Sequence, residues 1–202
     1  QVIRGGQFLV KEAQPQDIFT PEDFTDEQKM MRDSVKEFVD REIWPNKEEF
    51  EKKNYALTEE IMRKAGELGF LGVAVPEEYE GLGMDFVSTM LVCDYISGAT
   101  GSVATAFGAH TGIGTLPITL YGTEEQKKKY LPKLASGEFI GAWGLTEPNT
   151  GSDAMRMKTT AVKEGNEWVI NGAKNWITHG LSGDVAVVLV RTGELLDSKG
   201  IT

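Results

Sequence analysis

The sequence predicts an α+β protein, in which an N-terminal all-α helical bundle is followed by an antiparallel β-sheet or barrel domain that is incomplete in this chain. Apolar residues recur at helical spacing behind capping sequences at Thr25 and Thr123. From Phe139 onward the apolar pattern changes to the alternation that is typical of strands. We therefore expect an N-terminal arm (1–24), a helical domain (25–138) and a partial β-domain (139–202).

The balance of charges narrows the classes of partner. The 202 residues include 31 acidic and 21 basic side chains, which gives a net charge of −10. No basic stripe with interleaved aromatic residues occurs, so we expect no nucleic-acid partner. No apolar run reaches the length of a transmembrane helix, and the first residues lack the pattern of a signal peptide. We therefore expect an intracellular protein without a membrane span.

Cysteine and histidine are too few to indicate a disulfide or a metal site. The single cysteine, Cys93, lies in an apolar segment, which favours an inert buried thiol. The two histidines, His110 and His179, are far apart in sequence, so we expect no metal ligands. His110 is a general base in principle, but a lone histidine in an apolar helix is more often structural.

The first two helices are expected from their capping signals. Thr25 and Gln28 are the ends of a capping box, and Pro45 is expected to end the helix that follows. Thr58 is expected to cap a second, short helix that ends near Gly69.

The predicted third helix is unusually apolar, and the segment after it is rich in small residues. Asp85 is expected to cap a helix that is apolar on nearly all sides and therefore buried. Ser97–Gly114 is rich in glycine and alanine, which favours close contact between helices. Pro117 interrupts this helix, and Thr123 opens another that stops at Gly137.

A loop of small polar residues separates two apolar runs of the β-domain. The runs Phe139–Leu145 and Asp184–Arg191 suit buried strands. The loop, residues 146–153, contains Pro148, which fixes its own backbone angle, and Gly151, which lets an anionic ligand approach the backbone. Its threonine and serine hydroxyls supply rotatable hydrogen-bond donors.

A hairpin is expected after this loop. A strand from Glu167 leads into Asn171-Gly172, the strongest short-range hairpin signal. The return strand, Asn175–Thr178, then projects Trp176 and Thr178 from one face. Together, the loop and the strand suit a flat aromatic cofactor with a phosphate tail. The alternative is that the loop is only a turn and the tryptophan only packs in the core.

Two motifs carry a resemblance to a known family. LTEPNTGSD (145–153), followed by INGAKNWIT (170–178), closely resembles the paired flavin-site motifs of the acyl-CoA dehydrogenase family. From about Phe24 onward the chain resembles that family's N-terminal helical domain and the first part of its β-domain. The resemblance implies that these two segments bind FAD.

The resemblance also implies roles for single residues. The predicted cofactor-binding residues are Trp143, Leu145, Thr146, Gly151, Ser152, Trp176, Ile177 and Thr178. Gly151 and Ser152 would reach the pyrophosphate, and Ser152 would also approach the acyl-CoA. Thr178 would hydrogen-bond near flavin N5, which gains electron density as it accepts the hydride.

The chain departs from the family at a few positions. It has His179 where the family often has asparagine, and Asn149-Thr150 where the family often has a glycine-rich or serine-containing pair. The segment around Gly108 resembles long-chain members, whereas the loop resembles short-chain or glutaryl-type members. The chain length of the substrate therefore stays open. A second hypothesis for the small residues is a slot for the acyl chain, with Gly108 as a substrate-binding residue.

The implied activity is that of an FAD-dependent acyl-CoA dehydrogenase, which dehydrogenates acyl-CoA thioesters between the α and β carbons. The family's glutamate base lies in a C-terminal helical domain, and no residue here matches it. We therefore predict no catalytic residue in this chain and no turnover by the chain alone. The family further implies electron-transferring flavoprotein as a partner, a homo-oligomer at full length, and a location in the cytoplasm or mitochondrial matrix.

Other classes of protein remain open. A related acyl-CoA oxidase or nitroalkane oxidase would share these motifs, and a non-catalytic helical interaction module would use the helices alone. If the ligand is a coenzyme A thioester, Arg156, Lys158 and Lys174 would offset the acidic surface near the motifs.

Overall fold

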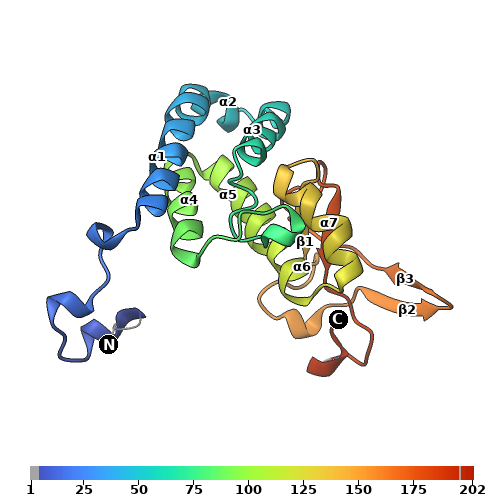
Figure 1. Ribbon diagram of the computed structural model, residues 1–202. Coiled ribbons are helices and arrows are strands. Elements are labelled where there is room, and N and C mark those ends of the chain that lie inside the picture. The colour runs from blue at the N-terminus through green and yellow to red at the C-terminus, as the bar shows by residue number, and fades with distance from the viewer. Residues whose placement is uncertain (1–4, 196) are drawn as a thin grey trace.

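The computed structural model describes residues 5–195 and 197–202, with a helical region followed by a small β region (Figure 1). The helices are α1 (Asp26–Phe38), α2 (Lys47–Glu51), α3 (Tyr55–Glu67), α4 (Phe86–Ala99), α5 (Gly101–Gly108), α6 (Leu116–Tyr121) and α7 (Glu124–Ser136). The strands are β1 (Gly141–Gly144), β2 (Thr160–Glu164), β3 (Glu167–Asn171) and β4 (Val185–Val188). The predicted α+β class with a leading helical region is confirmed.

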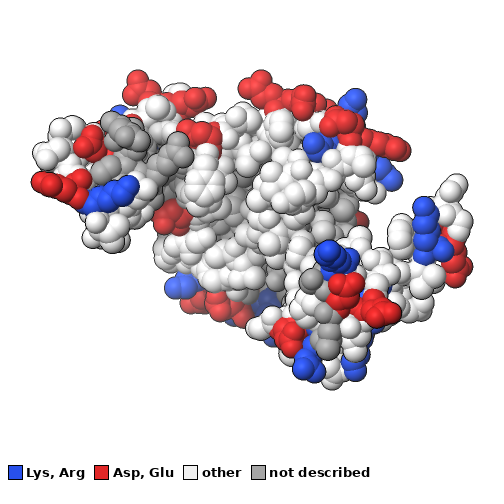
Figure 2. Space-filling view, turned by 90° about the horizontal axis from the view of Figure 1, so that it is seen from below, with Lys and Arg blue, Asp and Glu red and all other residues white. Residues whose placement is uncertain are grey.

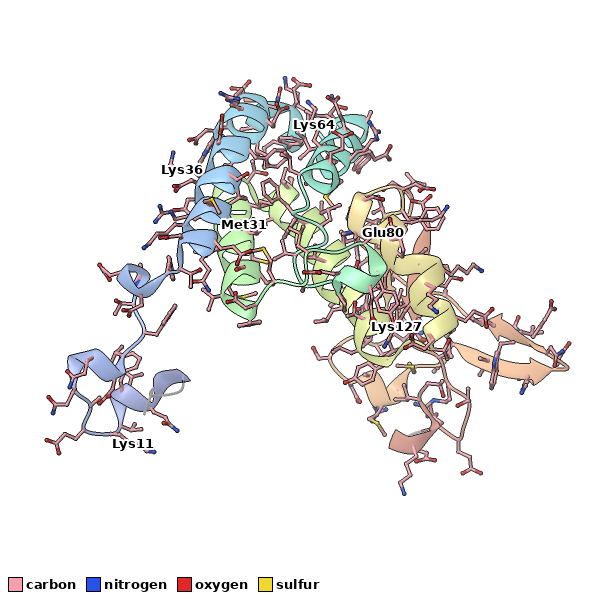
Figure 3. All side chains as sticks on the ribbon, viewed as in Figure 1. Lys11, Met31, Lys36, Lys64, Glu80 and Lys127 are labelled. Atoms are coloured by element: carbon pink, nitrogen blue, oxygen red, sulfur yellow. The ribbon has the colours of Figure 1, made fainter. Side chains whose placement is uncertain are left out.

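Helix α1 begins where its capping box predicts. The Thr25 hydroxyl accepts from the amide of Gln28, and the Gln28 side chain accepts from the amide of Thr25. One face of α1 is buried around Val35, and Met31 packs against the same core, whereas Lys36 faces solvent (Figure 3). The apolar period in the sequence therefore identifies the face that packs against α4.

The expected end of the first helix at Pro45 is wrong. The helical path continues through a π-helical turn, Val39–Ile43, and a 3-10 turn, Trp44–Asn46, into α2. Pro45 lies in the first turn of the 3-10 segment, a position to which the fixed φ of proline is suited.

The start of α3 also differs from the prediction. Asn54, not Thr58, is the cap, because its side chain accepts from the amide of Leu57 at 3.2 Å. Thr58 lies in the first turn, and its hydroxyl donates to the carbonyl of Asn54. The predicted end is confirmed, since Gly69 follows α3 with a φ of 80°.

Helix α4 is buried on one side only. The Asp85 cap is confirmed, because its carboxylate accepts from the amide of Ser88 at 2.8 Å. Val92 and Ile96 are buried against α1 and α5. Phe86, however, is 75 % exposed, so the expected burial on all sides is wrong.

The small residues before α6 serve two different purposes. The segment folds as α5, a π-helical turn (Ala109–Thr115) and α6, with Pro117 in the first turn of α6. A β-carbon at Gly114 would lie 2.7 Å from the backbone of Gly141, so this glycine permits close contact with β1. A β-carbon at Gly108 would meet nothing within 4 Å. The close contact is therefore between a helix and a strand, and Gly108 borders open space.

The last helix, α7, follows its capping signals at both ends. Thr123 and Gln126 form the predicted capping box, and Gly137 closes the helix with a φ of 76°. Leu131 and Leu134 are fully buried and form the centre of a second, smaller core.

The strands among the described residues form two separate pairs. β1 pairs with β4 in parallel, with Trp143 opposite Val187, whereas β2 and β3 are antiparallel. The antiparallel prediction therefore holds for one pair only. The predicted strand 184–191 is shortened to β4, because the chain turns away to pair again at Arg191.

The predicted hairpin at Asn171-Gly172 is wrong. The turn lies at Gly165-Asn166, between the paired residues Glu164 and Glu167, and β3 follows it. Gly165 supplies the positive φ, 63°, that such a turn requires. Gly172 instead lets the backbone pass Thr159, since its β-carbon would lie 2.6 Å from the Thr159 Cα.

Charged side chains of both signs lie mainly at the edge of one face of the molecule (Figure 2). Figure 2 shows Asp, Glu, Lys and Arg side chains around the rim of one face, while the middle of that face carries few charged residues. Within the described ranges, no helix has both the length and the apolar character needed to cross a bilayer.

Candidate functional site

The two predicted motifs meet in one groove. A cavity of about 250 Å³ is lined by Ala109, Ile113, Trp143, Leu145, Thr146, Trp176, Ile177 and Thr178. All of the predicted cofactor residues except Gly151 and Ser152 are among these. The remaining two lining residues come from the π-helical turn, which the sequence did not single out for this role.

Strand β1 supplies the first side of the groove. Its pairing with β4 fixes Trp143, and the amide of Leu189 donates to the carbonyl of Gly144 at 2.9 Å just before Leu145. The close contact between Gly114 and Gly141 brings the π-helical turn against this strand. The groove therefore lies where the helical and β regions meet.

An irregular segment supplies the second side. Asn175–Thr178 is not a strand, because Trp176 has a φ of 58°, in the left-handed region. The predicted projection of Trp176 and Thr178 from one strand face is therefore wrong, although both line the groove. The amide of Asn175 donates to the carbonyl of Thr146 at 2.8 Å, which ties this segment to the first motif.

The indole of Trp176 has a free surface. Its side chain is 86 % exposed, although large aromatic residues usually bury most of their area. The hydroxyl of Thr146 makes no hydrogen bond to any described residue. The groove thus offers an open aromatic face beside a free hydroxyl, a combination that suits a flat, polar-edged ring.

Gly151 and Ser152 lie outside the groove lining, in the loop that follows it. The loop is closed by reciprocal backbone hydrogen bonds between Glu147 and Thr150. Gly151 lies beside Thr146, since its β-carbon would be 3.7 Å from the Thr146 Cγ2. Ser152 is exposed at the end of the loop.

The sequence analysis missed Glu147, although it lies within the first motif. Its carboxylate is buried and accepts from the amide of Lys158 at 2.6 Å, the amide of Thr159 at 2.9 Å and the ammonium of Lys174 at 2.9 Å. Burial alone would raise the pKa of Glu147, but these donors outweigh it and lower the pKa to about 2. A lone glutamate between threonine and proline carries no signal of such a network.

Lys174 is not free to contact a ligand phosphate. Its ammonium also donates to the carbonyl of Leu145 at 3.0 Å, and its side chain is 12 % exposed. Arg156 is paired with Asp153 at 2.8 Å. Of the basic groups expected near the motifs, Lys158 has an exposed side chain, while its amide binds Glu147.

His110 has a structural position. It is fully buried, its Nδ1 accepts from the amide of Gly141 at 2.9 Å, and its Nε2 lies 3.0 Å from the carbonyl of Leu134. Because an amide can only donate, Nε2 carries the proton and the ring is neutral. Burial lowers the pKa of His110 to about 4. The ring thus joins the π-helical turn to β1 and α7.

A larger cavity adjoins the groove. It has a volume of about 420 Å³, lies between α2, α3, α5 and residues 177–182, and shares Ile177 and Thr178 with the groove. Thr105 and Ala106 of α5 line it, whereas Gly108 lines neither space. His179 closes one edge, with its Nε2 2.8 Å from the carbonyl of Ala106. The substrate role of Gly108 stays a prediction.

Comparison with known proteins gives consistent matches over nearly the whole chain. Residues 25–138 match the model of the acyl-CoA dehydrogenase N-terminal domain, and residues 142–202 match that of the middle domain. A probable acyl-CoA dehydrogenase of Bacillus subtilis is 47 % identical over 192 residues, which are 94 % of this chain and 32 % of the relative.

Two further matches are also to acyl-CoA dehydrogenases. The mitochondrial isovaleryl-CoA dehydrogenase of Pongo abelii is 39 % identical over 181 residues, 88 % of this chain and 43 % of the relative. The crystal structure of an acyl-CoA dehydrogenase complexed with FAD from Bacillus anthracis superposes with a TM-score of 0.86 and 48 % identity, covering 93 % of this chain and 33 % of that one. The chain thus spans between a third and a half of the length of these relatives.

Proposed function

Because the chain belongs to the acyl-CoA dehydrogenase family, we propose that it provides the flavin groove and part of the substrate site of an FAD-dependent acyl-CoA dehydrogenase. The observation that carries this proposal is the convergence of Trp143–Thr146 and Trp176–Thr178 on one groove. Relatives of this kind have been solved with FAD.

The size and lining of the groove fit one part of the cofactor. Its volume of about 250 Å³ is below the roughly 300–1,000 Å³ of sites that enclose a whole drug-sized ligand. The groove would therefore hold the flavin ring, and Gly151 and Ser152 of the adjoining loop would contact the phosphate-bearing part of FAD. FAD bound there supplies the acceptor for a hydride. Trp176 would pack against the ring, and the hydroxyl of Thr178 would donate a hydrogen bond to it.

The adjoining cavity of about 420 Å³ is the proposed place of the acyl group. A substrate carbon must lie beside the flavin edge to transfer a hydride, and this cavity shares Thr178 with the groove. Its apolar residues, such as Met62 and Leu181, suit an acyl chain. Gly108 lies at the end of the same helix, α5, and borders open space outside this cavity, so its role as a substrate-binding residue is a separate proposal.

The chain holds and orients its ligands but does not supply the base that removes the α-proton. The acidic side chain that lines the larger cavity, Glu59, is solvent-exposed on α3. We propose that the base comes from a further domain, that the chain alone does not turn over acyl-CoA, and that the complete protein is a homo-oligomer. Electron-transferring flavoprotein as acceptor and the cytoplasm or mitochondrial matrix as compartment belong to the same proposal, supported by family resemblance.

Two exposed tryptophans allow a matched test of the groove. Trp176→Ala removes an indole from the groove, whereas Trp168→Ala removes one from β3, where Trp168 is 53 % exposed and outside the groove. Titration with FAD, followed by flavin fluorescence and visible absorbance, should give a roughly two- to tenfold weaker Kd for Trp176→Ala, because a lost aromatic stacking contact is worth about 0.5–1.5 kcal/mol. Trp168→Ala should bind as the unchanged protein does. Equal Kd values for both variants, or no FAD binding at all, would contradict the proposal.

Turnover is tested in a protein that carries this chain together with a C-terminal helical domain of the family. Reduction of an electron-accepting dye by acyl-CoA, without comparable oxygen consumption, is expected for a dehydrogenase. Oxygen consumption that matches acyl-CoA use would indicate an oxidase instead.

Replacing Gly108 by phenylalanine should shorten the preferred acyl chain, and an unchanged chain-length profile would exclude the glycine from the substrate site.

A further inference from the structure

We propose that Glu147 is a positioning residue that holds the two sides of the flavin groove in register through Lys174. The inference rests on the proposed function for its ligand. It goes beyond that function by assigning the alignment of Trp176 to a buried ion pair outside the groove lining.

The carboxylate of Glu147 has donors on both oxygens. Lys158 N lies 2.6 Å from Oε2, while Thr159 N and Lys174 Nζ each lie 2.9 Å from Oε1. The two side chains of the ion pair are 6 % and 12 % exposed, so water and salt screen the attraction little. A pair of this kind is costly to break, because removal of one partner leaves a buried charge unpaired.

The network reaches both sides of the groove within two residues. Glu147 directly follows Thr146, and Lys174 binds the carbonyl of Leu145 at 3.0 Å. Asn175, the next residue, donates to the carbonyl of Thr146 at 2.8 Å, and Trp176 comes directly after it. The backbone that carries the indole is therefore tied to the first motif by contacts that begin at Glu147.

The same carboxylate fixes the base of the β2–β3 hairpin. Thr159 leads into β2, and its backbone is in close contact with Gly172, which follows β3. One end of the hairpin is bound to Glu147 through Thr159 and the other through Lys174. Trp176 has a left-handed backbone conformation that is unfavourable for tryptophan, so external contacts must hold it.

Glu147→Gln removes the charge but keeps the size of the side chain. The glutamine side chain has one acceptor oxygen, whereas the donors around Glu147 bind both carboxylate oxygens. The NH₂ group of glutamine would face an N–H group, so at least one donor loses its partner. We expect the Kd for FAD to rise roughly tenfold, within the range of measured couplings between a site and a residue that does not touch the ligand. Glu138→Gln is the matched control, because Glu138 forms an exposed ion pair with Lys133 at 2.7 Å.

A double-mutant cycle separates positioning from general stabilisation. If Glu147 acts through Trp176, Glu147→Gln should change the Kd for FAD by less than about twofold when Trp176 is already alanine. The same roughly tenfold loss in both backgrounds would overturn the inference. Lys174→Gln, which removes the other partner, should give the same pattern and serves as the second variant if Glu147→Gln does not fold.

Hydrogen exchange tests the inference without a ligand. In the ligand-free chain, the amide of Asn175 should exchange at least about tenfold faster in Glu147→Gln than in the unchanged chain, and at an unchanged rate in Glu138→Gln. An unchanged rate at Asn175 in Glu147→Gln would overturn the positioning role. Absence of FAD binding in the unchanged chain would instead refute the proposed function and leave this result to decide the positioning role alone.

Discussion

Two junctions between segments of the chain differ in charge: the neutral ring of His110 joins the helical region to β1, and the ion pair between Glu147 and Lys174 joins the two motifs. Where the helical region meets β1, the uncharged ring of His110 joins the backbones of Gly141 and Leu134. Where the two motifs meet, the ionised carboxylate of Glu147 joins Lys174 and two backbone amides. Burial opposes charge at both sites, but three donors stabilise the charge of Glu147, whereas the Nδ1 of His110 faces an amide donor and gains nothing from a second proton. The molecule thus uses neutral hydrogen bonds where the helical region meets β1, and a buried ion pair beside the candidate groove.

The largest effect is expected from removing the neutral ring. His110→Ala should lower the free energy of unfolding by about 2–4 kcal/mol, because it leaves a cavity and two buried backbone groups without partners. Urea unfolding measures this change. His179→Ala, which loses a single hydrogen bond at a half-buried position, should cost about 1 kcal/mol. Equal costs would remove the distinction between the two histidines.

The pH dependence should separate the two junctions. The pKa of His110 is lowered from 6.5 to about 4, so between these values the unfolded chain binds a proton that the folded chain does not. Stability should therefore fall as pH drops from 6.5 to 4, by up to about 3 kcal/mol. The pKa of Glu147 is lowered from 4.5 to about 2, so its contribution is present above 4.5 and lost as pH falls towards 2.

Unfolding curves at a series of pH values measure both windows. His110→Gln should remove most of the loss of stability between pH 6.5 and 4 and leave the loss between pH 4.5 and 2 unchanged. Glu147→Gln should remove the loss between pH 4.5 and 2 and leave the loss between pH 6.5 and 4 unchanged. A profile in which either variant changes both windows equally would show that the junctions are not independent.

Two glycines give smaller effects of opposite sign. Gly114→Ala should destabilise the chain by about 1–3 kcal/mol, because the new methyl group would collide with the backbone of Gly141. Gly108→Ala should stabilise it by about 0.5–1 kcal/mol, since its helical backbone accepts alanine and the space around it is open. Thermal unfolding measures both changes, and destabilisation by Gly108→Ala would mean that α5 packs closely there after all.

The site could be predicted in part. Six of the residues that line the groove are among those predicted for the cofactor, whereas Ala109 and Ile113 of the π-helical turn are not, and the backbone of Asn175–Thr178 is irregular and not a strand. Glu147 could not be predicted in its role, because its donors lie 11 to 27 residues away. The hairpin was expected at the wrong glycine, since Gly165 and Gly172 both suit a turn and only the packing against Thr159 distinguishes them.

Features that depend on residues close together along the chain could be predicted from the amino-acid sequence. The caps at Thr25, Asp85 and Thr123 are hydrogen bonds between residues three apart, so the letters alone are sufficient to identify them. The tertiary structure decided which glycines are crowded, which histidine is buried, and that β1 pairs in parallel with β4. Those outcomes depend on groups that meet only after folding, where burial and the number of available donors decide whether a side chain carries a charge.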